Sequence, residues 1–229
     1  AVHAVGALTV DGSTFESNSS TTSGGALHGA AAVSVDNSTF TDNAATTNGG
    51  AINSVGAITL ADVTFDGNTA GSDGGAINAS AALTDTGSTY TGNQAAQAGA
   101  IELDAGDSSI SGATFEGNSA TTWGGAIVAA YGGSLSITGS SFRGNTAENA
   151  GAIDQNGTGD FTLRRVSFVK NEATVGGGAL AIGTPSRSSN LVGLTFRGNR
   201  APTRGGRDVM LYEKEDNTER SMRANARVW

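Results

Sequence analysis

An aromatic residue recurs along the chain at nearly constant spacing, and this regularity limits the possible folds sharply. It stands at eight positions: Phe15, Phe40, Phe65, Tyr90, Phe115, Phe142, Phe168 and Phe196. An Asn follows at the third position after it each time: Asn18, Asn43, Asn68, Asn93, Asn118, Asn145, Asn171 and Asn199. A pair of small residues, usually Gly-Gly, then precedes an apolar position, as in GGAL and GGAI. Three linked columns in eight copies identify a repeat protein.

Each repeat predicts short β-strands. Gly pairs and β-branched residues at this spacing would break helices. An alternating segment such as AVSV or AITL places apolar residues seven and five positions before the aromatic residue. Since five is odd, one continuous strand cannot point both sets inward, and turn formers such as Asp36-Asn37 indicate a corner between them. The GGA[IL] step supplies a third strand.

Three short strands and three corners in about 25 residues describe one coil of a parallel β-helix. About eight coils, stacked roughly 4.8 Å apart, would enclose a continuous apolar core. We expect the Asn column to form a ladder of side-chain amides between coils and to occupy the left-handed corners. We expect the glycines to permit the next tight corner.

The repeats divide the chain into two parts. Residues 1–212 are predicted to form the β-helix, and residues 213–229 lose the period and become charged, as in a cap, a linker or a docking tail. Ala1, Val2 and His3 align with Ala26, Leu27 and His28, so the first coil starts midway. We therefore expect this sequence to be a segment of a longer chain.

Composition excludes several classes of protein. The chain has 35 Gly without a three-residue period, which excludes collagen, and no Cys, which excludes disulfides and thiolate sites. Residues 1–142 contain 12 acidic and no basic residues, so we expect no nucleic-acid binding. No apolar run approaches the roughly 18 residues of a membrane helix, so we expect no transmembrane segment in this chain.

The alternation of FxxN and GGA[IL], in segments such as FTDNAATTNGGAI and FEGNSATTWGGAI, resembles the repeats of chlamydial polymorphic outer membrane proteins. The resemblance covers residues 1 to about 210, with departures at Tyr90, Ala98, Ala150 and Arg207, the last in place of Ala. It implies a right-handed, pectin-lyase-like parallel β-helix displayed at a cell surface. It also implies an adhesive or structural role.

Candidate chemistry is sparse. Parallel β-helices also include enzymes that act on polysaccharides, but the acids Glu16, Asp66 and Glu116 form a column instead of a convergent pair. His3 and His28 share a column and are expected to stack about 4.8 Å apart; a surface pair is favoured over a metal site. We therefore predict no catalytic residues, no cofactor and no metal, and keep a polysaccharide lyase or hydrolase as the alternative.

A Thr column before the aromatic residues leaves ice binding as a minor alternative, although charged neighbours would disturb a regular Thr array. Partner contacts are predicted for Trp123, in the variable segment between Asn and Gly-Gly, and for Arg204, Arg207 and Trp229 near the basic end. Trp123 could instead pack over its own corner, and the basic end could simply balance charge. The sequence thus predicts an extracellular structural or adhesive shaft whose partner is a surface protein, a glycan or another subunit.

Overall fold

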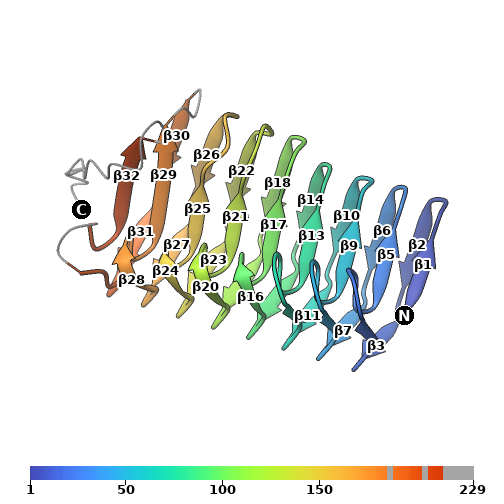
Figure 1. Cartoon of the computed structure of the whole chain (residues 1–229). Helices are drawn as coiled ribbons and strands as arrows, with labels where there is room; N and C mark the ends of the chain where they lie inside the picture. Colours follow the sequence, from blue (N-terminus) through green and yellow to red (C-terminus); the bar gives the residue numbers. More distant parts are fainter. Residues whose placement is uncertain (185–187, 203–205, 214–229) are drawn as a thin grey trace.

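The chain forms a parallel β-solenoid of about eight coils, which confirms the fold class predicted from the repeat (Figure 1). The structure, a computed structural model, describes residues 1–184, 188–202 and 206–213. Within these residues no helix is long and apolar enough to cross a membrane. Strands pair in parallel with the equivalent strands of the adjacent coils, as Val33 does with Ile58 and Phe40 with Phe65.

Three sheets enclose the core. Sheet A contains β1 Val2–Ala4, β5 Leu27–Gly29, β9 Ile52–Ser54, β13 Ile77–Ala79, β17 Ile101–Leu103, β21 Ile127–Ala129, β25 Ile153–Gln155, β29 Leu180–Thr184 and β32 Val209–Glu213. Sheet B contains β2 Leu8–Asp11, β6 Val33–Asp36, β10 Ile58–Ala61, β14 Leu83–Thr86, β18 Ser108–Ser111, β22 Leu135–Thr138, β26 Phe161–Arg164 and β30 Ser189–Val192. Sheet C contains β3 Thr14–Glu16, β7 Thr39–Thr41, β11 Thr64–Asp66, β15 Thr89–Thr91, β19 Thr114–Glu116, β23 Ser141–Arg143, β27 Ser167–Val169 and β31 Thr195–Arg197.

A fourth sheet corrects the prediction of three strands per coil. Sheet D contains β4 Ser19–Ser20, β8 Ala44–Ala45, β12 Thr69–Ala70, β16 Gln94–Gln97, β20 Ser119–Trp123, β24 Thr146–Asn149 and β28 Glu172–Gly176. It lies in the variable segment between Asn and the Gly pair. Its inward positions are small residues such as Ala70 and Ala120, which are too short to produce a marked apolar pattern in the sequence.

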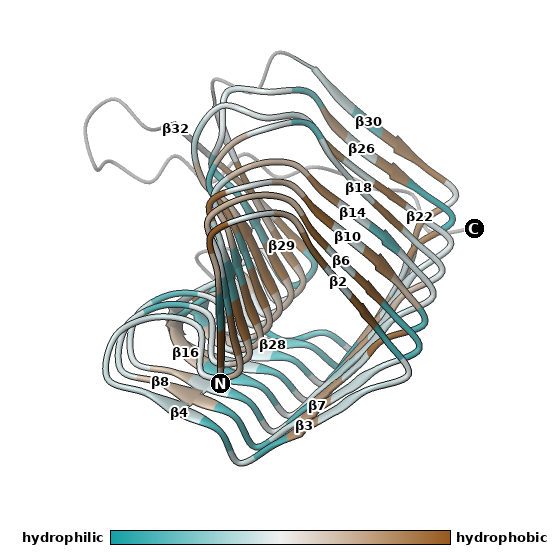
Figure 2. Ribbon diagram, turned by 90° about the vertical axis from the view of Figure 1, so that its right-hand side faces the viewer, coloured by the Kyte–Doolittle hydropathy of each residue, from teal (hydrophilic) through white to brown (hydrophobic). Residues whose placement is uncertain are grey.

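The core consists of aligned side-chain columns from sheets A, B and C. In the ribbon coloured by hydropathy, the hydrophobic segments of successive coils lie one behind another (Figure 2). The aromatic rings of adjacent coils stack with centroids 4.6–5.2 Å apart. Pairs such as Val33 and Val35 in sheet B, and single residues such as Ile52 in sheet A, fill the remaining space and are almost fully buried. No single coil could bury these residues without its neighbours.

The Asn column forms a continuous hydrogen-bonded ladder. The Asn68 side-chain nitrogen donates to Asn93 Oδ1 at 3.0 Å and to the carbonyl of Phe40 at 2.9 Å, and its backbone N–H donates to the same Asn93 oxygen. The left-handed corner, however, belongs to the preceding residue, as at Asp42 (φ 51°) and Lys170 (φ 55°). The expectation that Asn itself occupies the left-handed conformation was therefore wrong.

The two residues of the Gly pair have different roles. The first has positive φ, as at Gly124 (φ 62°), and Ala98 and Ala150 adopt this conformation at φ 52° and 56°. The second is limited by space, because a Cβ at Gly125 would collide with the carbonyl oxygen of Gly151 in the next coil. Ala therefore replaces Gly only at the first position, where it must adopt positive φ, and not at the second, where its Cβ would prevent the coils from stacking.

Candidate functional site

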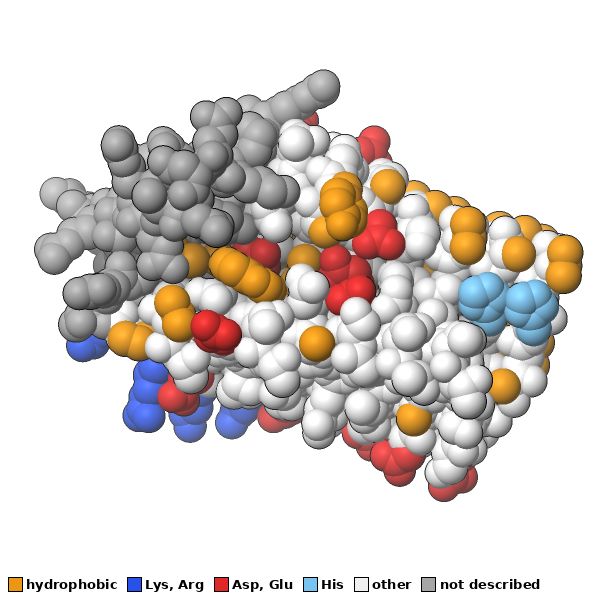
Figure 3. Space-filling model, viewed as in Figure 1, with side chains coloured by type: hydrophobic (Ala, Val, Ile, Leu, Met, Phe, Trp, Pro, Cys, Tyr) orange, Lys and Arg blue, Asp and Glu red, His pale blue; other side chains and the backbone are white. Residues whose placement is uncertain are grey.

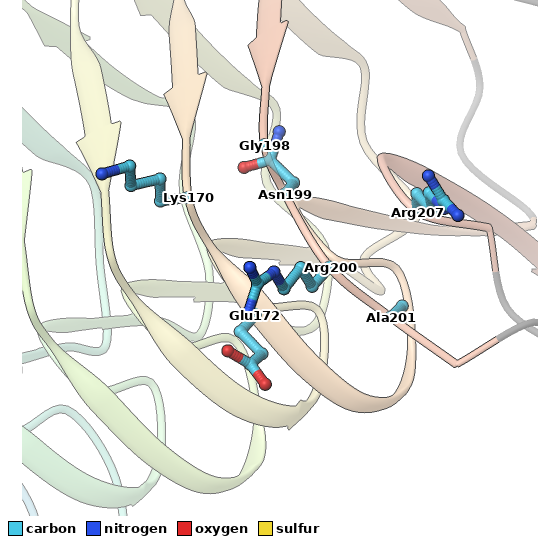
Figure 4. Close-up of a pocket in the computed structure, with 7 residues that line it drawn as sticks. All are labelled: Lys170, Glu172, Gly198, Asn199, Arg200, Ala201 and Arg207. Carbon is cyan, nitrogen blue, oxygen red and sulfur yellow. The ribbon is translucent and has the colours of Figure 1, made fainter.

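A cavity of about 710 Å³ opens at the C-terminal end of the solenoid (Figure 4). We call it the end cavity. It is lined by Lys170, Glu172, Gly198, Asn199, Arg200, Ala201 and Arg207. It lies where sheet D ends, since β28 is the last strand of that sheet among the described residues.

Two successive coils supply most of the lining. Lys170 lies in the corner between β27 and β28, and Glu172, on the other side of a ladder Asn, begins β28. Arg200 follows the ladder Asn of the next coil and forms a parallel bridge with Glu172. All three side chains are exposed. The stacked corners therefore place a carboxylate between cationic groups of neighbouring coils.

Arg207 lines the cavity from the final Gly-pair position. Because β32 pairs Val209 with Leu180, Gly206 takes the first position of the pair (φ 72°) and Arg207 takes the second. The sequence comparison placed Arg207 in the Ala position, and the structure shifts it to the preceding position. In the preceding coil, a Cβ at Gly178 would collide with the carbonyl oxygen of Arg207. The Cβ of Arg207 would collide in the same way with a further coil stacked on it.

The Asn ladder also ends beside the end cavity. The Asn199 side-chain nitrogen donates to Asp208 Oδ1 at 2.9 Å and to the carbonyl of Phe168 at 3.1 Å. The Asp208 carboxylate thus accepts the bond that a further ladder Asn would accept in the preceding coils. Arg207 and Asp208 together give this end a chemistry different from that of the repeating coils.

The end cavity is cationic in a molecule that is acidic over most of its length. Lys170, Arg200 and Arg207 line it together with one carboxylate, that of Glu172. Residues 1–142 have no Lys or Arg. On the face shown in Figure 3, Lys and Arg side chains gather toward the C-terminal end while acidic side chains spread along the rest. Guanidinium groups bind carboxylate, sulfate and phosphate oxygens through paired hydrogen bonds, so the cavity suits an anionic ligand.

The other residues noted in the sequence stay dispersed. The acid column is exposed on sheet C, where Glu116 pairs with Arg143 at 3.4 Å. His3 and His28 stack with ring centroids 4.9 Å apart, and His28 Nδ1 lies 3.2 Å from the Asn53 amide nitrogen. In the described part of the chain, no three or more His, Asp or Glu side chains group closely enough to hold a metal ion.

The predicted contact residues fall in three places. Trp123 is half-buried at the end of β20, and Arg207 is exposed in the end cavity. Arg204, Trp229 and the predicted tail beyond Glu213 lie outside the described residues. Sequence analysis predicted a basic end but did not single out Lys170, Glu172 and Arg200 as contact residues. A signal was present, because Lys170 occupies a corner position that holds Gly in four of the preceding coils.

Comparison with known proteins identifies the repeat. The Chlamydia polymorphic membrane protein repeat matches residues 12–30, 37–55, 62–80 and 112–130, together about a third of the chain. Each match runs from the corner before sheet C, through sheet D, to the end of a sheet A strand. No curated protein and no solved structure shows significant similarity to the chain.

Proposed function

We propose that this chain, which carries the Chlamydia polymorphic membrane protein repeat in four of its coils, is a non-catalytic shaft displayed at a cell surface. The repeat is named for a membrane protein family, which supports a surface location. The uniform stack of coils supports a structural role, because each coil repeats the same contacts along one axis. We further propose that the shaft adheres to a partner through the coils around the end cavity.

The cationic end cavity carries this proposal. Three exposed basic side chains line it, in a shaft that has no Lys or Arg from residue 1 to residue 142. The acidic coils repel anionic surfaces, whereas the basic coils around the end cavity attract them, so an anionic partner would bind at these basic coils. The partner chemistry that fits is a glycan bearing carboxylate or sulfate groups.

Charge reversal tests the proposal. Arg200→Glu combined with Arg207→Glu should reduce binding of the chain to a sulfated oligosaccharide at least tenfold, measured by surface plasmon resonance at physiological salt. Arg164→Glu combined with Arg197→Glu is the matched control, since both residues are exposed and neither lines the cavity. Equal loss in both double variants would contradict a localised site. Concentration-dependent self-association in sedimentation experiments, without oligosaccharide binding, would instead identify a second copy of the chain as the partner.

A further inference from the structure

A groove of about 390 Å³ opens on the outer face of sheet D, and we call it the sheet D groove. Thr121 of β20 lines one side, Thr174 and Val175 of β28 line the other, and Thr146 and Glu148 of β24 lie between them. These three strands follow one another along the lower side of the molecule (Figure 1). The groove therefore lies on the coils that precede the end cavity.

The sheet D groove arises from a difference in length between successive strands. β24 has four residues, whereas β20 and β28 on either side of it have five each. Asn149, the last residue of β24, pairs with Trp123 and Gly176, and the first residues of the three strands are also paired. The register shifts between these pairs, so each longer strand accommodates its extra residue as a bulge. The shorter coil is thus recessed between two longer ones.

The lining of the groove offers hydrogen-bond acceptors beside an apolar side chain. The Thr121 hydroxyl donates to a carbonyl of the preceding coil at 3.2 Å, and the Thr146 hydroxyl donates to Ser119 Oγ at 3.2 Å. Both hydroxyl oxygens therefore keep lone pairs that accept from a ligand. Glu148 adds an exposed carboxylate, which forms no ion pair with any residue that the structure describes. Val175, which is half-buried, supplies apolar surface.

This lining suits a neutral sugar. A sugar ring brings several hydroxyl donors for the Thr oxygens and the Glu148 carboxylate, and its C–H groups pack against apolar surface such as Val175. An anionic group is disfavoured in the groove, because the Glu148 carboxylate repels it. The groove thus differs from the end cavity, where Lys170, Arg200 and Arg207 favour an anion.

The sheet D groove and the end cavity meet at β28. Glu172 lines the cavity, and Thr174, two residues further along the strand, lines the groove. Because alternate residues of a strand point to the same face, both side chains point outward, and both are exposed. Glu172 pairs with Thr146 on one side and with Arg200 on the other, so Thr146 and Arg200 lie two coils, roughly 10 Å, apart. One linear ligand on the outer face of sheet D therefore reaches both places.

We propose that the sheet D groove binds the neutral part of a linear oligosaccharide whose single anionic terminal sugar lies in the end cavity. This inference rests on the proposed function, because it extends the anionic glycan bound at the end cavity over two more coils. It also specifies where the charge of that glycan lies. A uniformly sulfated chain would place sulfate groups beside Glu148, whereas a glycan with one terminal acid places only hydroxyls there.

A glycan with one terminal carboxylate and two neutral sugars behind it, 3′-sialyllactose, tests the groove. It should bind the full chain at least tenfold more tightly than N-acetylneuraminic acid alone, measured by NMR titration. Glu148→Ala should remove most of this advantage and leave the affinity for N-acetylneuraminic acid unchanged or slightly higher. Glu116→Ala is the matched control, since it removes the same charge from the exposed face of sheet C and should leave both affinities unchanged. Circular dichroism of each variant establishes that it is folded.

The sign of the change in Glu148→Ala separates a lost contact from a general charge effect. Removal of a carboxylate strengthens the binding of any anion nearby, so weaker binding of 3′-sialyllactose reports a contact with the groove. A uniformly sulfated oligosaccharide should instead bind this variant more tightly than it binds the wild-type chain.

The same ligands distinguish failure of this inference from failure of the proposed function. Equal affinity of the wild-type chain for 3′-sialyllactose and N-acetylneuraminic acid, with both lost in the Arg200→Glu and Arg207→Glu double variant, would overturn the groove and leave the end cavity as the binding site. Binding of the sulfated oligosaccharide without binding of 3′-sialyllactose would also overturn it. Absence of binding by all three ligands would refute the proposed function together with this inference.

Discussion

A single buried amide in the Asn ladder connects three coils. Asn118 Oδ1 accepts from the backbone and side-chain nitrogens of Asn93, and its Nδ2 donates to Asn145 and to the carbonyl of Tyr90. The amide-to-amide bonds run in one direction along the stack, and each amide also donates back to a backbone carbonyl of the preceding coil. Such a network is stable only when all of its members are satisfied.

Asn118→Ala should therefore be strongly destabilising. The change removes four side-chain hydrogen bonds and leaves buried donors on Asn93 and a buried carbonyl on Tyr90 without partners. We expect a loss of at least about 3 kcal/mol in the free energy of unfolding, measured by urea denaturation. Asn190→Ala, at an exposed Asn of β30, should change it by less than about 0.5 kcal/mol. Similar small changes in both variants would argue against the ladder as a major source of stability.

Two departures from the repeat compensate for each other inside the core. Tyr90 replaces the usual Phe, and Asp85 stands in a sheet B position that is Leu60 in the preceding coil. The Tyr90 hydroxyl donates to Asp85 Oδ2 at 3.0 Å, and both side chains are almost fully buried. Burial raises the pKa of Asp85 to about 6, against the lowering effect of hydrogen bonds from Ser88 and Tyr90.

The raised pKa of Asp85 predicts a pH-dependent loss of stability. Since the folded chain holds this proton more tightly than the unfolded chain, Asp85 costs nothing below about pH 4, and stability falls as the pH rises through about 6. A shift from 3.8 to about 6 corresponds to about 3 kcal/mol. Asp85→Asn should remove this dependence, so the difference in unfolding free energy between wild type and variant should grow between pH 4 and 6. A constant difference across this range would show that Asp85 does not titrate in the folded state.

In each coil, the Gly pair before sheet A meets two requirements, one on backbone conformation and one on space. The first residue of the Gly pair must adopt positive φ, and the second must leave room for the next coil. The steric requirement cannot be relieved locally, because the obstructing atom is a backbone carbonyl. The conformational requirement can be met by Ala at a cost of about 1–2 kcal/mol.

Substitutions at the two positions should therefore act in opposite directions. Ala98→Gly should raise the free energy of unfolding by about 1 kcal/mol, since the relief of left-handed strain exceeds the added backbone entropy. Gly125→Ala should lower it by about 2–3 kcal/mol through the collision with the Gly151 carbonyl. Thermal denaturation of both variants checks the pair. A destabilising Ala98→Gly would show that the positive φ at Ala98 carries no strain.

The whole molecule behaves as a stack whose stability comes from contacts between neighbouring coils. Sheet pairing is in register along most of the stack, and the buried aromatic column continues from Phe40 through Phe168. In such an assembly each coil depends on its two neighbours and on little else. The fold should therefore tolerate a change in the number of coils.

Deletion of residues 37–61, one complete period, should leave a folded and shorter solenoid. Asp36 and Ala61 occupy equivalent positions, so Asp36 would connect to Asp62 without a change of register. We expect unchanged circular dichroism per residue and a maximum dimension shorter by about 5 Å in small-angle X-ray scattering. Deletion of residues 37–48 alone removes only part of the period, would break the register and is the control. A disordered spectrum for the full-period deletion would contradict independent coils.

The sequence predicted the fold class because the spacing of residues within each repeat determines where strands and corners fall. The odd spacing between the sheet B residues and the aromatic residue required a corner, and this corner is present, with Asn37 at φ 47°. Sheet D was missed because its inward Ala residues leave almost no hydrophobic pattern. The register of Arg207 was misassigned because the final Gly pair follows a longer segment, and only strand pairing shows which Gly occupies which position.

The amino-acid sequence by itself determined the period, the residues that face the core and the parallel stacking, because each follows from local conformation and from the alternation of side chains along a strand. Only the tertiary structure decided where basic side chains gather around a cavity. The end cavity lies where sheet D ends, and the residue that takes the last Gly-pair position there depends on how β32 pairs with β29. That pairing follows a segment longer than the usual repeat, so spacing along the chain alone does not determine it.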